Sequence, residues 1–114
     1  MLWLVLNVIS FSHRFFCEEH LVDGSNDVDL FLVGVMDGHD GTLAADVVSE
    51  HLPPSVIHNV FKRKLDISEA HIHAFQKCED IMKKTESSAG CCVNSCVVWG
   101  RYLWSSNLGD CRAV

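Results

Sequence analysis

The chain has 114 residues and a mass of 12.7 kDa, the usual size of one domain, and 48% of its residues are hydrophobic. This composition is typical of a folded globular protein and excludes an intrinsically disordered one. Fifteen acidic against nine basic residues give a formal net charge of −6. We therefore expect no nucleic-acid partner, because binding to a phosphate backbone requires a basic face. No apolar run reaches the roughly 18 residues that a membrane-spanning helix needs, so we expect no membrane span.

The start of the chain is apolar. Residues Leu2–Phe11 are rich in branched side chains, which predicts a β-strand. The same residues have the length of a signal-peptide core, but no basic leader precedes them and no clear small-residue cleavage site follows. We treat residues 1–11 as an apolar strand or atypical start, followed by one domain over residues 12–114. The six cysteines form no recognisable disulfide framework, which favours an intracellular protein, cytoplasmic or nuclear.

The first half of the domain is predicted to contain a loop, a strand and a helix, in that order. The acidic segment Cys17–Asp29 contains Asp-Gly-Ser-Asn-Asp, which predicts a turn within a loop. The next run, Leu30–Met36, is continuously apolar and predicts a strand buried on both faces. A helix is expected over about Leu43–His51, with Thr42 as its N-cap and the two prolines at 53 and 54 as its end.

The second half predicts a further helix and a hairpin. The spacing Asp66-x-x-Glu69 resembles a capping box and predicts where the helix begins. Two β-rich runs, Cys91–Trp99 and Tyr102–Asn107, are separated by Gly100-Arg101, the composition of a two-residue type II′ turn. The order of strand, strand, helix, helix and hairpin predicts an α+β fold with the helices on one face of a mostly antiparallel sheet.

The segment that carries chemical information directly follows the buried strand. Asp37-Gly-His-Asp-Gly41 places a carboxylate at the strand end, and its glycines let the backbone turn tightly and approach a ligand. Carboxylate and backbone carbonyl oxygens are the ligands that Mg²⁺ and Mn²⁺ prefer. By itself the pentapeptide is also compatible with an ordinary strand-to-helix turn that leaves His39 on the surface.

Motifs along the chain resemble those of the metal-dependent protein serine/threonine phosphatases of the protein phosphatase 2C type. Phe31–Gly41 is similar to the family's apolar strand ending in D-G-H-x-G. Ala89–Cys92 resembles the start of its S-G-[ST]-T-A strand, and Ser106–Val114 resembles its A-N-[VL]-G-D-[SC]-R-A-V strand. Arg14–Glu19 has the spacing of its R-x-x-x-E-D element. The resemblance covers about residues 12–114 and implies a partial β-sandwich with helices packed on the sheet, the N-terminal part of a protein phosphatase 2C-like domain.

The resemblance implies metal-dependent hydrolysis of phosphoserine and phosphothreonine, with a phosphorylated protein as the substrate and Mg²⁺ or Mn²⁺ as the cofactor. Asp37 corresponds to the carboxylate that bridges two metal ions. The carbonyl of Gly38 and the carboxylate of Glu18 correspond to ligands of one of these ions. Glu19 stands where the family usually has an aspartate that contacts the metal through water.

Two further residues correspond to groups that act on the substrate. His39 matches the proposed general acid, which would protonate the leaving serine or threonine oxygen. Arg14 matches the arginine that binds the substrate phosphate as a bidentate fork. The alternative for Arg14 and Glu18 is a surface ion pair without a catalytic role.

Catalytic domains of this family are more than twice as long as this chain. Their later aspartates, which complete the coordination of the second metal, have no counterpart up to Val114. We therefore expect a truncated domain with an incomplete two-metal site. The alternative function is a catalytically inactive phosphatase-like binding module or a truncated product.

Other chemically reactive residues are expected to be structural. The cysteines within Cys91–Cys96 lack paired C-x-x-C spacing and are expected to be buried thiols, not zinc ligands. The histidines outside the motifs, including the pair His71-x-His73, are expected to be solvated. Lys62–Lys64 is expected to be a solvated basic cluster at a helix end, with docking as the alternative.

Overall fold

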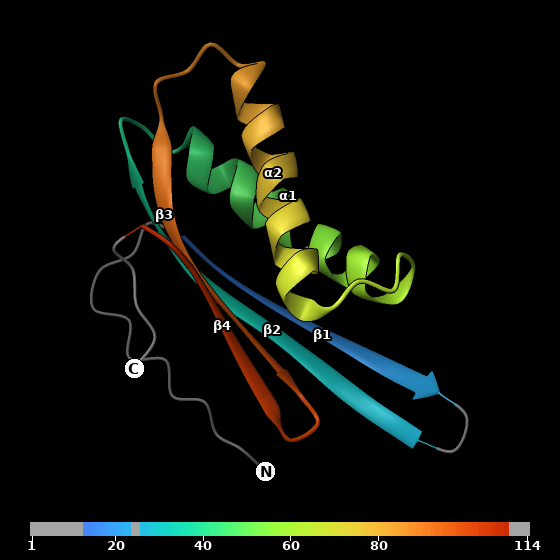
Figure 1. Cartoon of the computed structure of the whole chain (residues 1–114). Coiled ribbons are helices and arrows are strands. Elements are labelled where there is room, and N and C mark those ends of the chain that lie inside the picture. Colours follow the sequence, from blue (N-terminus) through green and yellow to red (C-terminus); the bar gives the residue numbers. More distant parts are fainter. Residues whose placement is uncertain (1–12, 24–25, 110–114) are drawn as a thin grey trace.

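The computed structural model describes residues 13–23 and 26–109, and the strand predicted at Leu2–Phe11 lies outside this part of the chain. The described chain forms two strands, two helices and a hairpin, in that order (Figure 1). The elements are β1 (His13–Asp23), β2 (Asn26–His39), α1 (Leu43–Phe61), α2 (Ile67–Lys83), β3 (Gly90–Trp99) and β4 (Tyr102–Leu108).

The four strands form one antiparallel sheet in the order β1-β2-β3-β4. Both helices lie on the same side of this sheet (Figure 1). Helix α1 approaches β1, β2 and β3, whereas α2 approaches β4. The predicted α+β arrangement, with helices on one face of an antiparallel sheet, is therefore confirmed.

The hydrophobic core lies between the sheet and the two helices. Alternate residues of β2 and β3 point into it, and the register places Met36 opposite Val93 and Leu32 opposite Val97, all four with 0% exposure. The helices contribute a second set of buried side chains: Ala45, Val48, Leu52, Val56, Ala70 and Ala74. On the other face of β2, Val33 and Val35 are also buried, as the continuous apolar run predicts. Each fully buried Val, Leu or Met side chain stabilises the fold by roughly 1.5–3 kcal/mol.

The segment Cys17–Asp29, predicted as a loop, is mostly strand. Strand β1 continues to Asp23, and β2 begins at Asn26, with these two residues opposite each other. Pairing between the two strands satisfies alternate backbone N–H and C=O groups on both sides of the connection, so the loop-like composition of this segment does not decide its conformation.

Helix α1 does not end at the two prolines, contrary to the prediction. It continues through Pro53 and Pro54 to Phe61. The apolar stripe of the helix continues beyond the prolines with Val56 and Val60, which are 0% and 6% exposed. Burial of this stripe against the sheet offsets the missing proline N–H bonds. Thr42 occupies the N-cap position, but its side chain makes no capping hydrogen bond to the described residues.

Helix α2 and the hairpin form as predicted. The carboxylate Oδ1 of Asp66 accepts a hydrogen bond from the backbone N–H of Glu69 at 2.8 Å, which satisfies one of the free donors of the first turn. Gly100 has φ +62°, the left-handed value that the first central position of a type II′ turn requires. Neither described helix is both long and apolar enough to cross a membrane.

The expectation that all remaining histidines are solvated is wrong for His71. This residue is 2% exposed and links α2 to β3. Its Nδ1 lies 2.9 Å from the carbonyl oxygen of Ile67, and its Nε2 lies 3.0 Å from Oγ of Ser95. A carbonyl can only accept, so Nδ1–H donates to Ile67 and the neutral Nε2 accepts from the Ser95 hydroxyl. His73, two residues later, is exposed as expected.

Candidate active site

Two of the sequence motifs meet at one end of the sheet. The last three residues of β2 are Asp37, Gly38 and His39, and they pair with the first three residues of β3. The Cα partners are Asp37 with Cys92, Gly38 with Cys91, and His39 with Gly90. Because the hydrophobic core determines the register of these two strands, it also determines which residues of the two motifs face each other.

The third motif reaches the same end of the sheet through β4. Its Leu108 pairs with Val93, and the next residue, Gly109, has φ +95°. A Cβ added at Gly109 would lie 2.5 Å from Sγ of Cys92, so only glycine fits at this position without displacing the cysteine. Cys92 is in turn the partner of Asp37. The remaining residues of this motif, 110–114, lie outside the described chain.

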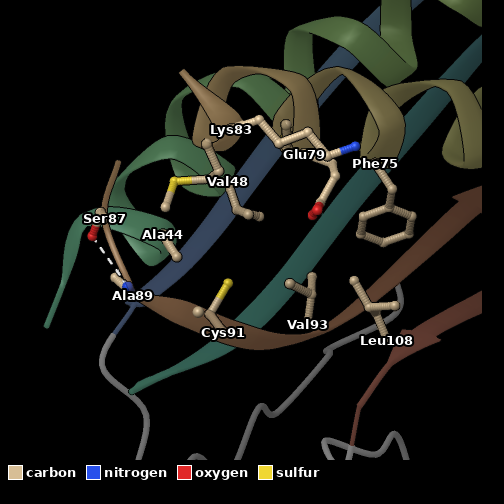
Figure 2. A pocket seen from close by; sticks show the side chains of 13 residues that line it. Ala44, Val48, Phe75, Glu79, Lys83, Ser87, Ala89, Cys91, Val93 and Leu108 are labelled. Atoms are coloured by element: carbon tan, nitrogen blue, oxygen red, sulfur yellow. Dashed lines mark hydrogen bonds between the residues drawn. The ribbon is translucent and has the colours of Figure 1, made fainter. Parts of the chain in front are cut away.

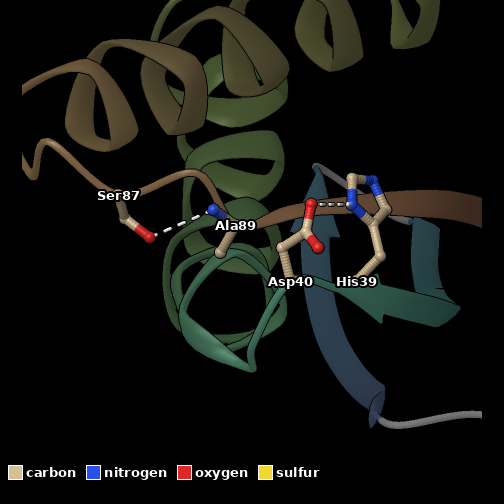
Figure 3. A network of polar contacts seen from close by, with 4 residues as sticks. All are labelled: His39, Asp40, Ser87 and Ala89. Atoms are coloured by element: carbon tan, nitrogen blue, oxygen red, sulfur yellow. Dashed lines mark hydrogen bonds and ion pairs between the residues drawn. The ribbon is translucent and has the colours of Figure 1, made fainter.

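His39 lies at the exposed edge of this site. Its imidazole packs against Gly90, and its Nδ1 is 3.6 Å from Oδ2 of Asp40 (Figure 3). The two side chains are 62% and 69% exposed, so their interaction contributes little to stability. Asp40 adopts φ 56° and lies before the N-cap position of α1, so its contribution here is to the turn and to the charge beside His39.

The oxygen donors at the end of β2 match the chemistry of a hard divalent cation. Asp37 is exposed and carries a carboxylate, and the adjacent Gly38 carries a backbone carbonyl at the same end of β2. Within the part of the chain that the structure describes, no three His, Cys, Asp or Glu side chains gather closely enough to hold a metal ion. The donor type therefore fits Mg²⁺ or Mn²⁺, whereas the described side chains do not complete a coordination shell.

The β1–β2 register separates the predicted acidic ligands from Asp37. Glu18 is opposite Phe31, and Glu19 is opposite Leu30. Asp37 is six positions beyond Phe31 on β2, which corresponds to about 20 Å along the strand at about 3.3 Å per residue. A shift of β1 by six residues would place Glu18 opposite Asp37 and, because six is even, would leave every side chain on its present face.

Arg14 is nearer to the motif than the two glutamates. It is opposite Val35, two positions before Asp37 on β2, and thus about 7 Å away along the strand direction. The structure therefore brings together Asp37, Gly38 and His39, with the backbone of Arg14 close by. Sequence spacing alone does not reveal this difference between Arg14 and Glu18, because it contains no information on the register of a hairpin.

A pocket of about 230 Å³ lies on the helix side of the same end of the sheet (Figure 2). Ala44 and Val48 of α1 and Phe75 of α2 face Val93 of β3 and Leu108 of β4 across it. Gly90, the partner of His39, also contributes to its wall. Apolar side chains form much of the wall together with the charged groups of Glu79 and Lys83 and the hydroxyl of Ser87, so the lining is mixed in polarity. No sequence pattern indicated it, because its residues come from four separate elements.

The comparisons with known proteins agree on one family. The family model described as protein phosphatase 2C matches residues 7–114. A probable protein phosphatase 2C 14 of Arabidopsis thaliana is 40% identical over 84 residues, which cover 71% of this chain and 19% of that protein. A probable protein phosphatase 2C 32 of Oryza sativa subsp. japonica is 36% identical over 93 residues, which cover 77% of this chain and 24% of that protein. A probable protein phosphatase 2C 2 of Paramecium tetraurelia is 30% identical over 110 residues, which cover 83% of this chain and 36% of that protein. The chain thus spans between about a fifth and a third of the length of these relatives.

Proposed function

Since this chain belongs to the protein phosphatase 2C family, we propose that it carries part of the active site of a metal-dependent phosphatase acting on phosphoserine and phosphothreonine in proteins. The observation that carries the proposal is the pairing of Asp37, Gly38 and His39 with the start of β3. This pairing gathers an exposed carboxylate, a backbone carbonyl and an exposed imidazole at one end of a rigid sheet. These are the groups needed to hold a hard cation and to transfer a proton beside it.

The proposed metal ligands are the carboxylate of Asp37, the carbonyl of Gly38 and the carboxylate of Glu18, with Glu19 contacting the metal through water. Bound Mg²⁺ or Mn²⁺ supplies an acidified water and positive charge for phosphoryl transfer. Glu18 can take this role only if β1 slides along β2 by six residues from the observed register. The proposal therefore includes a change in β1 pairing when metal binds.

His39 and Arg14 are proposed to act on the substrate. The imidazole of His39 is 62% exposed, so a substrate oxygen can reach it, and an imidazole is a side chain that can pass a proton to such an oxygen. The guanidinium of Arg14 would bind two oxygens of the phosphate group. His39 is replaceable without opening the core, so its contribution can be tested separately from folding.

The test of activity is Mn²⁺-dependent hydrolysis of para-nitrophenyl phosphate by the purified chain. We expect hydrolysis that requires Mn²⁺ and falls at least a hundredfold in Asp37→Asn. The matched control is Asp80→Asn, which makes the same change of charge at an exposed position of α2 and should keep full activity. A folded chain without Mn²⁺-dependent hydrolysis would contradict the proposal for this chain and favour a phosphatase-like binding module.

The register change has a test that does not depend on turnover. Paramagnetic Mn²⁺ bound at Asp37 broadens NMR signals of nearby amides. If β1 shifts, the amide of Glu18 is broadened together with that of Gly38, whereas Phe31 remains sharp. Broadening that is confined to the end of β2 and to Arg14 would show that the observed register persists and that Glu18 is not a ligand.

A further inference from the structure

A second pocket, with a volume of about 580 Å³, lies between the second half of α1 and the first half of α2. It shares no lining residue with the pocket of Figure 2, and none of its lining residues belongs to the motifs at the end of the sheet. Ser55, Asn59 and Arg63 recur at every fourth residue of α1 and the turn that follows it, and His73 and Lys77 are four residues apart on α2. Residues at this spacing share one helix face, so both helices present polar side chains to the same groove.

The described residues lining this pocket carry positive charge and no acidic group. Arg63 and Lys77 are charged at neutral pH, and His58 and His73 add two imidazoles. This concentration of basic groups is local, since the whole chain has a formal charge of −6. Basic groups on several sides of the pocket would therefore attract an anion, whereas the chain as a whole is negatively charged.

Two hydrogen bonds position Asn59 and Arg63 beside the pocket. Nδ2 of Asn59 donates to the carbonyl oxygen of Ala70 at 3.1 Å, which connects α1 to α2. Nη1 of Arg63 donates to Oδ1 of Asn59 at 3.2 Å, which orients the guanidinium and leaves its other N–H groups for a ligand. Asn59 is 6% exposed, so this arrangement is anchored in the interior.

Ser55 provides an independent observation that points to a ligand. It lines the pocket and is 7% exposed, and its buried Oγ has no hydrogen-bond partner among the described residues. Native proteins contain few buried hydroxyls without a partner, because such a group has lost its hydrogen bonds to water. A rotation of the Ser55 side chain about its Cα–Cβ bond toward the pocket would let an oxygen of a ligand accept this hydrogen bond.

We propose that the pocket between α1 and α2 binds a phosphate-type oxyanion, either free or as a phosphate monoester. The fork of Arg63 and the ammonium group of Lys77 neutralise its charge, and the hydroxyl of Ser55 donates a further hydrogen bond. A tetrahedral oxyanion has more acceptor oxygens than a carboxylate, and the pocket offers donors from both of its sides. This site does not depend on Asp37 or on hydrolysis.

The test is an NMR titration of the whole isotope-labelled chain at constant pH, with EDTA present to remove metal ions. Inorganic phosphate and phosphoserine are added separately, and sodium chloride at equal ionic strength provides the baseline. We expect saturable shifts of the imidazole signals of His58 and His73 with a dissociation constant in the millimolar range. The double variant Arg63→Gln/Lys77→Gln should weaken binding at least tenfold, and Ser55→Ala should weaken it severalfold.

The matched control is Lys83→Gln/Lys84→Gln, which removes the same charge at the other end of α2 and should bind phosphate as the original chain does. Asp37→Asn should also retain binding, so failure of this proposal and failure of the proposed phosphatase activity are distinguishable. Tighter binding of phosphoserine than of inorganic phosphate identifies a monoester as the preferred source, and tighter binding of inorganic phosphate identifies the free anion. Shifts that do not saturate, that chloride reproduces, or that survive in Arg63→Gln/Lys77→Gln would overturn the proposal.

Discussion

The imidazole of His39 lies against the backbone of Gly90, its partner on the neighbouring strand. A Cβ added at Gly90 would be 2.5 Å from Cε1 and 2.7 Å from Nε2 of His39. Non-bonded contacts of a Cβ atom in real proteins are essentially never this short. The place of the proposed proton donor on β2 thus depends on the absence of a side chain on β3. Two motifs that are far apart in the sequence are coupled through this contact.

Gly90→Ala should displace the imidazole of His39 while leaving the fold intact. The contact involves the far end of an exposed side chain, so the ring can rotate away at little cost. We expect the free energy of unfolding to change by less than about 1 kcal/mol, and any Mn²⁺-dependent hydrolysis to fall at least tenfold. The measurements are urea unfolding, the chemical shift of the His39 imidazole, and the rate of aryl phosphate hydrolysis.

Gly100→Ala is the control for Gly90→Ala, because it should change stability and leave the His39 imidazole in place. Gly100 has φ +62° and open space around it, so alanine there is strained by its backbone and contacts nothing at the site. We expect a loss of roughly 1 kcal/mol or more of stability with the His39 signal unchanged. If Gly90→Ala left the His39 signal in its original position, the packing of the imidazole on Gly90 would be refuted.

Ser95→Ala should destabilise the fold by removing the partner of a buried imidazole. Nε2 of His71 accepts from the Ser95 hydroxyl at 3.0 Å, and both residues are at most 2% exposed. We expect urea unfolding to report a loss of about 1–3 kcal/mol, because the buried acceptor is left unpaired. Ser105→Ala, at an exposed position of β4, is the matched control and should change stability by less than about 0.5 kcal/mol.

Stability should decrease as the pH falls below the ordinary histidine pKa. Burial lowers the pKa of His71 from 6.5, and the hydrogen bond to the Ile67 carbonyl opposes this by a smaller amount. Above pH 6.5 both folded and unfolded chains hold a neutral His71, so its contribution is constant. Below pH 6.5 the unfolded chain takes up a proton that the folded chain does not, and the free energy of unfolding falls until the pH reaches the folded pKa.

The variant that checks this dependence is His71→Gln, which cannot titrate in this range. It should be less stable at pH 7.5 because it loses the fitted imidazole, but its stability should decrease less between pH 7.5 and pH 5.5. Urea unfolding at both values measures the difference, and the other histidines contribute equally to both proteins. An identical decrease in the two proteins would show that His71 is not the responsible group.

Asp66→Ala should shorten or destabilise α2 at its start. The Asp66 carboxylate accepts from the N–H of Glu69 at 2.8 Å, and its negative charge also complements the helix dipole. We expect a loss of about 1 kcal/mol in the free energy of unfolding. Ser68→Ala, an exposed change in the same turn, should have little effect, and an equal loss in both variants would contradict a specific capping role.

Sequence reasoning could predict the features that depend only on residues close to one another along the chain. The strand that leads to Asp37 follows from the apolar run Leu30–Met36, although the observed strand continues through the motif to His39. The cap at Asp66 and the turn at Gly100 also depend on neighbouring residues alone. The same reasoning could not place Glu18 relative to Asp37, because a shift of six residues between β1 and β2 preserves the alternation of side chains.

The sequence by itself determined the α+β class, the presence of two successive helices followed by a hairpin, and the motifs of the protein phosphatase 2C family, since each is encoded by short-range patterns of residues. It did not determine strand β1, because the predicted loop Cys17–Asp29 covers most of His13–Asp23. Only the tertiary structure decided that α1 continues past Pro53 and Pro54, that His71 is buried, and that His39 packs on Gly90. These features depend on contacts with other elements. The free energy of burying a helix stripe or a paired imidazole exceeds the local preference of proline or histidine, so no local pattern could reveal them.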